Sequence, residues 1–157
     1  MSLQKEQIGI LVWCFGHAGL SVIENNYKLW NSLEMFILSK VGLNKINPFT
    51  LSQITYGFQK SNQGSKEFWK KVGEHYNNQH HKIDNLGIAI MINSFGRSNE
   101  ASISWVLPTF KPIILNQMMS FNQTEALLIL SGIASESSMK TKGYLDSALY
   151  TSIFEAY

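Results

Sequence analysis

The chain has 157 residues, of which 45% are apolar and 15% are charged, and its formal net charge at pH 7 is +2. A chain of this length forms one ordinary domain, and its apolar content excludes an intrinsically disordered protein. The charged fraction lies below the roughly 25% of a typical soluble domain, which indicates that a partner covers part of the surface.

Individual residue types narrow the class of protein further. Arg97 is the only arginine, so twelve of the thirteen basic residues are lysines. Arginine forms bidentate phosphate contacts and stacks on bases, so its scarcity argues against nucleic-acid binding. A chain rich in lysine and asparagine but poor in arginine is typical of an AT-rich genome, such as that of a protist. The single cysteine, Cys14, excludes a disulfide-stapled secreted domain.

The sequence predicts neither a membrane span nor an N-terminal targeting segment. The apolar stretches 8–15 and 88–92 are shorter than the roughly 18 residues that suggest a membrane-spanning helix. Residues 1–6 match neither a signal peptide nor an arginine-rich transit peptide. Any organelle address is therefore expected to be internal or to have been removed.

A repeated pattern of apolar residues predicts the fold. Four anchor residues follow one another at intervals of 43, 37 and 38 residues, and they are Phe15, Phe58, Phe95 and Ile133. Apolar residues precede every anchor by four and by seven positions, which places each trio on one face of a helix. These residues are Leu11, Ile54, Met91 and Ile129, and then Ile8, Leu51, Ile88 and Ala126.

Two further features recur in register with the anchors. The position before each anchor is small, which lets a neighbouring helix approach closely, and it holds Cys14, Gly57, Ser94 and Gly132. The position eleven residues before each anchor is a strong N-cap type in three of four cases, and it holds Gln4, Asn47, Asp84 and Asn122. Glu125 follows Asn122 by three residues and predicts a capping box.

The pattern predicts the helices in chain order. Their ranges are 4–19, 26–42, 48–61, 65–80, 85–97, 100–119, 123–135 and 142–156. The second helix of each pair carries an aromatic residue, and these are Trp30, Trp69, Trp105 and Tyr144. Pro108 and Pro112 should kink or split the helix predicted over 100–119, because each removes a backbone donor.

The resulting fold class is all-α. We expect a short α-solenoid of about four helical hairpins that forms a single domain over residues 1–157. Its units would be about 4–46, 47–83, 84–121 and 122–157. The longer first interval between anchors agrees with an atypical end unit.

Two of the predicted first helices resemble those of a known family. The segments 51–58 (LSQITYGF) and 125–134 (EALLILSGIA) resemble the first helix of octotricopeptide and heptatricopeptide repeats. The helical-repeat region of the FAST-kinase-like proteins is similar, and such units are hairpins of about 37 to 38 residues. The resemblance implies a mitochondrial or plastid protein that acts on organellar RNA, or that belongs to an organellar ribosome or a related assembly.

One histidine cluster resembles a metal site. His75, His80 and His81 lie near Glu74, but their spacings of five and six residues differ from the i, i+4 pair of a helical zinc site. The preferred interpretation is a solvated helix end, where histidines interact favourably with the helix dipole.

The sequence offers no convincing set of catalytic residues. Cys14 and His17 could form a nucleophilic pair. The position of Cys14 is small in every unit, however, so a buried structural cysteine is preferred. The chain also lacks the phosphate-cradling glycine motif of nucleotide-binding proteins. We therefore expect no enzyme activity, no cofactor and no metal.

One lysine-rich segment is the candidate for contact with RNA or with a partner. It comprises Lys66, Trp69, Lys70, Lys71 and Lys82. Lysines beside an aromatic residue can hold a phosphate backbone while the ring stacks on a base. The preferred alternative places Trp69 in the core and the lysines on a solvated face.

These features favour a noncatalytic accessory or scaffold subunit of a large mitochondrial assembly. The candidate assemblies are a respiratory-chain complex, the ATP synthase and the mitochondrial ribosome, and the expected partners are other protein subunits. The alternative is an organellar RNA-binding helical-repeat protein, which the short length and the near-neutral charge disfavour. The helix with Trp13, or the end with Ile153 and Phe154, is expected to dock onto a neighbour.

Overall fold

The computed structural model describes residues 5–19, 26–139 and 147–156. Within these residues the chain forms eight α-helices, joined by short 3-10 and π-helical segments, and no strand. The prediction of an all-α fold is therefore confirmed. Its physical basis is apolar spacing of three and four residues, which buries one face of each helix.

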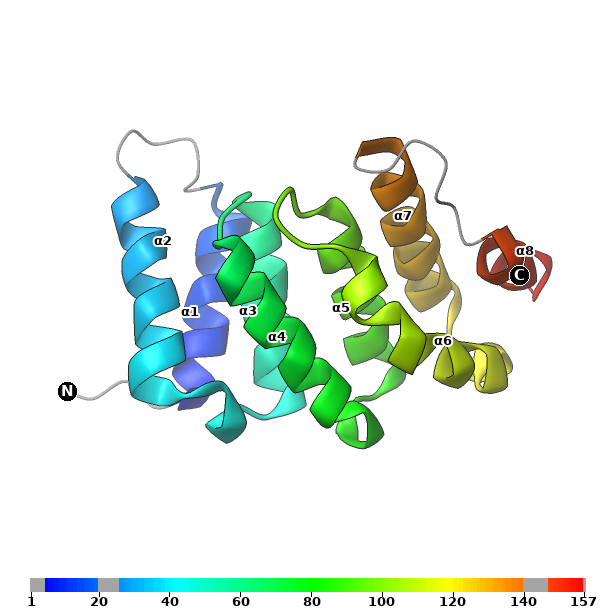
Figure 1. The fold of residues 1–157 in the computed structure, drawn as a ribbon, viewed down its shortest axis with the longest axis horizontal. Coiled ribbons are helices and arrows are strands. Elements are labelled where there is room, and N and C mark those ends of the chain that lie inside the picture. The colour runs from blue at the N-terminus through cyan, green and yellow to red at the C-terminus, as the bar shows by residue number, and fades with distance from the viewer. Residues whose placement is uncertain (1–4, 20–25, 140–146, 157) are drawn as a thin grey trace.

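The first helices of the predicted pairs lie side by side. They are α1 (Lys5–His17), α3 (Pro48–Lys60), α5 (Asn85–Arg97) and α7 (Gln123–Met139), and each packs against the next. The second helices are α2 (Asn26–Met35), α4 (Lys66–Asn78), α6 (Leu107–Asn116) and α8 (Ser147–Ala156). Figure 1 shows the chain advancing along its long axis, from α1 and α2 at one end to α7 and α8 at the other.

The predicted second helices differ from the observed ones in detail. After α2 the chain widens into η2 (Phe36–Val41), a π-helical turn, and then forms the 3-10 turn η3 (Leu43–Lys45). After α4 it forms the 3-10 turn η4 (His80–Lys82). Of the range predicted as 142–156, residues 142–146 lie outside the described part of the chain.

The helix predicted over 100–119 is divided as expected at Pro108, whereas α6 continues past Pro112 to Asn116. The range 100–119 forms η5 (Ile103–Trp105), then α6, and then η6 (Met118–Ser120). Pro108 lies in the first turn of α6, where its missing N–H has no intrahelical partner to lose. Pro112 lies inside the same helix, which is correspondingly short.

Side-chain caps start the inner helices at the predicted residues. The Oδ1 atoms of Asn47 and Asp84 accept hydrogen bonds from the backbone N–H groups of Thr50 and Gly87, each at 2.8 Å. Asn122 and Glu125 form the predicted capping box, in which each side chain accepts from the other residue's backbone N–H. The three caps are confirmed, and Gln4 lies outside the described residues.

The core is a continuous line of aromatic rings that joins successive helix pairs. Trp30 of α2 meets Phe58 of α3 at 4.9 Å between ring centroids, and Phe58 stacks on Phe68 of α4 at 4.3 Å. Trp69 of α4 then meets Phe95 of α5 at 5.3 Å. All five rings are buried, and these contacts pack α2 on α3 and α4 on α5, the first helix of the following pair in each case.

Glycines set the closest approaches between first helices. A Cβ atom on Gly57 would lie 2.3 Å from the carbonyl oxygen of Val12, and one on Gly16 would lie 2.7 Å from the Cα of Gly57. The same contact recurs between α5 and α7, where a Cβ on Gly96 would lie 2.0 Å from the carbonyl oxygen of Gly132. The helix pairs α1–α3 and α5–α7 therefore pack backbone against backbone.

Candidate functional site

The α3–α5 contact differs from these two glycine contacts. By sequence register, the positions of the α3–α5 pair that match the Gly16–Gly57 and Gly96–Gly132 pairs hold Gln59 and Ser94. The contact between α3 and α5 is less extensive than the two glycine contacts. A groove of about 360 Å³ lies between α3 and α5, and we call it the central groove.

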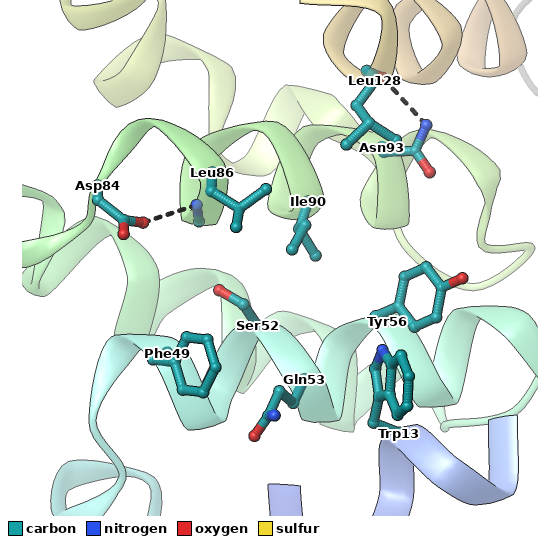
Figure 2. Close-up of a pocket in the computed structure, with 11 residues that line it drawn as sticks. Trp13, Phe49, Ser52, Gln53, Tyr56, Asp84, Leu86, Ile90, Asn93 and Leu128 are labelled. Carbon is teal, nitrogen blue, oxygen red and sulfur yellow. Dashed lines mark hydrogen bonds between the residues drawn. The ribbon is translucent and has the colours of Figure 1, made fainter. Parts of the chain in front are cut away.

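Apolar side chains line most of the central groove. Phe49 of α3 is 66% exposed at its rim, and Leu86 and Ile90 of α5 face it from the other side. Trp13 of α1 and Leu128 of α7 complete the wall (Figure 2). Four parallel helices thus contribute to one apolar surface.

Three polar side chains of the central groove are engaged within the protein. Asp84, the only charged lining residue in the described part of the chain, caps α5. Asn93 Nδ2 donates to the carbonyl oxygen of Leu128 at 3.0 Å, and Ser52 Oγ donates to the carbonyl oxygen of Pro48 at 3.0 Å. These bonds leave no nucleophile paired with a base among the lining residues, so the site is suited to binding apolar groups.

An aromatic cluster closes one end of the central groove. The rings of Trp13 and His17 stack with centroids 4.6 Å apart, and Trp13 lies 6.4 Å from Tyr56. The Lys60 ammonium lies 5.5 Å from the centroid of the Tyr56 ring, within cation–π range. This end of the groove therefore combines exposed rings with a positive charge, whereas Asp84 lies at the other end.

The lysine-rich segment lies elsewhere, on α4 and η4. Lys66, Lys70, Lys71 and Lys82 are exposed, but Trp69 is fully buried and its Nε1 donates to the carbonyl oxygen of Gln63 at 3.2 Å. Trp69 therefore cannot stack on a base, which corrects its inclusion among the contact residues. A role of the four lysines in binding stays a prediction.

Lys71 pairs with an acidic residue of its own helix. Its Nζ lies 2.8 Å from Glu67 Oε1, one helical turn away. The hydrogen bond and the charge of Lys71 lower the pKa of Glu67, and the same two effects of Glu67 raise the pKa of Lys71. Both side chains are exposed, so the pair contributes little to stability.

The histidine cluster lies where α4 ends. His80 Nδ1 is 2.8 Å from the carbonyl oxygen of Asn77, and His81 extends from η4 beside it. His75 is half-buried, and burial lowers its pKa. Among the described residues, no three histidine, cysteine or acidic side chains gather at metal-binding distance.

Cys14 lies on the surface, so the prediction of a buried cysteine is wrong. The small position before an anchor faces the preceding first helix, as Gly57 faces α1 and Gly132 faces α5. No described helix covers that side of α1. The neighbouring His17 stacks on Trp13.

The sequence signal for the central groove was present but not used. Phe49 and Leu86 occupy equivalent positions nine residues before their anchors, and Gln59 and Ser94 stand where the other helix pairs have glycines. An apolar residue outside the core stripe and a large residue at a close-contact position together predict a groove between the two helices.

The fold and the groove define an all-α protein with an apolar groove on its surface. No protein-family model, curated protein or solved structure matches the chain. The resemblance to octotricopeptide-like repeats therefore remains a prediction from the sequence. Within the described ranges, no helix is both long and apolar enough to cross a bilayer.

Proposed function

We propose that the chain is a short α-solenoid of about four helical hairpins that serves as a noncatalytic scaffold subunit of a larger assembly. Three findings support the proposal: parallel first helices, caps at equivalent positions, and the recurrence of the glycine contact. Such an array presents extended surfaces to partners without any moving part.

The central groove is the observation that carries the proposal. Its rim exposes Phe49 and Leu86, and burying each would contribute about 1.5–3 kcal/mol to association. The apolar lining favours a partner segment with apolar side chains. Asp84 and Lys60 lie at opposite ends of the groove, so they favour a segment with a positive charge near Asp84 and a negative charge near Lys60. An amphipathic helix of a neighbouring subunit has this chemistry.

The mitochondrial location is part of the proposal and rests on the family resemblance. The candidate assemblies remain a respiratory-chain complex, the ATP synthase and the mitochondrial ribosome. Subcellular fractionation of the native source, with the chain followed by antibody, tests the location independently of any binding partner. Recovery of the chain outside the mitochondrial fraction would contradict it.

The binding role is tested by purification from the native source. Tagged wild-type chain should co-purify with a defined set of subunits at fixed stoichiometry, measured by mass spectrometry. Phe49→Asp and Leu86→Asp should release those subunits, because each places an unpaired charge in the central groove. Met35→Asp, at an exposed apolar position on α2, should retain them. Equal recovery with all variants would rule out the groove as the binding site.

RNA binding is the alternative function, and the exposed lysines of α4 favour it. Lys66 and Lys70 lie one turn apart on a solvated helix face. A filter-binding titration with single-stranded RNA at two salt concentrations tests this function, because contacts with phosphates weaken as salt rises. Binding that falls with salt and with Lys66→Glu would favour RNA over the scaffold role.

A further inference from the structure

The two ends of the helix row carry complementary edges. The inner first helices are α3, α5 and α7, and each contacts the preceding first helix through two positions. One position lies directly before the anchor, and the other lies four residues before that position. In α3 these positions are Gly57 and Gln53, which lie against α1. In α1 the equivalent positions are Cys14 and Ile10, and both are exposed, Ile10 by 54%. We call these two residues the leading edge.

The anchor of α1 is also incompletely covered. Phe58, Phe95 and Ile133 are buried, whereas Phe15 is only half-buried. The anchors Phe58 and Phe95 each meet an aromatic ring from the second helix of the preceding pair, Trp30 and Trp69 respectively. The leading edge therefore exposes the groups that the inner first helices bury against the preceding helix pair.

The opposite edge of the row is the outer side of α7. The residues that α5 turns toward α7 are Ala89, Ile92 and Gly96, all buried. Their equivalents in α7 are Leu127, Leu130 and Ala134, and Leu127 is 61% exposed. These three residues, with Tyr150 and Phe154 of α8, line a groove of about 660 Å³, which we call the terminal groove.

The leading edge and the terminal groove match in size and charge. The contact that pairs Gly16 with Gly57 and Gly96 with Gly132 would pair Ala134 with Cys14, again two small residues. No charged side chain lines the terminal groove among the described residues, and Ile10 and Cys14 are uncharged. Tyr150 and Phe154, whose rings stack with centroids 6.4 Å apart, add aromatic surface to the terminal groove that could cover the half-buried Phe15.

We infer that the terminal groove of one copy binds α1 of a second copy, so that the chain associates head to tail. The inference rests on the proposed repeat, because it extends the α5–α7 contact by one unit. An interface between two different surfaces of the same protein generates open chains or closed rings, in contrast to a two-fold symmetric dimer.

Two charged variants test this arrangement. Ala134→Arg alters the terminal groove, and Cys14→Arg alters the leading edge. Each variant alone should associate about tenfold or more weakly than the wild type, because docking would bury an unpaired charge. An equimolar mixture should form a one-to-one dimer, since Cys14→Arg keeps an intact terminal groove and Ala134→Arg keeps an intact leading edge.

Sedimentation velocity over a concentration series measures the wild type, the two variants and the mixture. Circular dichroism confirms that each variant is folded, as expected for substitutions at exposed positions. A wild-type chain that stays monomeric at every soluble concentration overturns the inference. A mixture that behaves as the sum of its separate components also overturns it, since a head-to-tail interface must be restored by mixing.

Matched controls separate this inference from the central-groove proposal. Met35→Arg and Phe49→Asp lie outside both edges and should associate as the wild type does. Loss of association in Phe49→Asp would place the self-contact in the central groove and overturn the head-to-tail arrangement. Retained association in that variant, with loss of its co-purifying subunits, would support both proposals separately.

A cysteine pair provides a positional test. In Ala134→Cys, oxidation by diamide should join Cys14 of one copy to position 134 of the next, with two electrons and two protons passing to the diamide. Peptide mapping should find the 14–134 disulfide between chains and a ladder of linked species. Only 14–14 or 134–134 links would indicate a symmetric contact and overturn the inference.

Discussion

Tyr76 and His75 are neighbours on α4 whose side chains differ in burial and in the direction of their pKa shifts. The Tyr76 hydroxyl is fully buried and shares a 2.8 Å hydrogen bond with Thr55 Oγ1, and burial raises the pKa of Tyr76 to about 12. The phenol therefore stays neutral at any physiological pH. His75, one position earlier, lies at the edge of the core, where protonation is disfavoured.

His75 should make stability depend on pH. Burial lowers its folded-state pKa, an effect that the positive charge of Lys82 reinforces and a backbone hydrogen bond involving Ile46 opposes. Below the ordinary histidine pKa of about 6.5, the unfolded chain binds the proton more readily than the folded one. The free energy of unfolding should therefore fall as the pH drops through that value and show no such contribution above it.

Urea unfolding at pH 8.0, 7.0, 6.0 and 5.5 measures this dependence. His75→Gln should remove part of the decrease below pH 6.5, whereas His80→Gln, at an exposed position in η4, should retain that part. Identical pH profiles for the wild type and His75→Gln would show that another group controls the acid-side stability.

At the scale of the elements, glycine contacts decide how closely the helices pack. The α1–α3 and α5–α7 pairs meet at backbone atoms, whereas the contact between α3 and α5 is less extensive. The central groove lies at this less extensive contact.

Gly57→Ala should destabilise the protein by about 1–3 kcal/mol or more, because the added methyl group meets the backbone carbonyl of Val12. Gly73→Ala is the matched control on α4, since its Cβ would meet only side-chain atoms, of Phe95 at 3.3 Å and of Val106 at 3.6 Å. The cost of Gly73→Ala should be offset by up to about 1 kcal/mol, because alanine has a higher helix propensity than glycine. Chemical denaturation compares the two variants, and equal stabilities would contradict the glycine contact.

At the scale of the whole molecule, the aromatic line makes the helix pairs depend on one another. Trp30, Phe58, Phe68, Trp69 and Phe95 form consecutive ring contacts across three pairs. None of these three pairs can be removed without exposing a ring of a neighbouring pair. The extensive contact between α5 and α7 joins the last pair to them, so the described helices are expected to share one stability.

Unfolding should accordingly be a single cooperative transition. Tryptophan fluorescence, which reports on Trp30 and Trp69 in the core, should follow the same denaturation curve as far-ultraviolet circular dichroism, which reports on all helices. Two separated curves would show that the α1–α4 and α5–α8 halves unfold independently, with the α3–α5 seam as the boundary.

Local signals in the sequence predicted most of the helices. Asn47, Asp84 and Asn122 begin helices where their side chains can accept a backbone hydrogen bond, and Pro108 ends the preceding segment. These effects act within one helical turn, so sequence spacing suffices to find them. The burial of Trp69 followed in the same way, from its recurrence at one place in each unit.

Contacts between helices could be predicted from the sequence only in part. The sequence by itself determined the all-α class, the caps and the small residues of the close contacts, because periodicity and capping are local properties. Only the tertiary structure decided that Cys14 is exposed and that a groove of about 360 Å³ lies between α3 and α5. Both outcomes depend on which helix lies beside which, and that arrangement is a balance of packing between residues far apart in the chain.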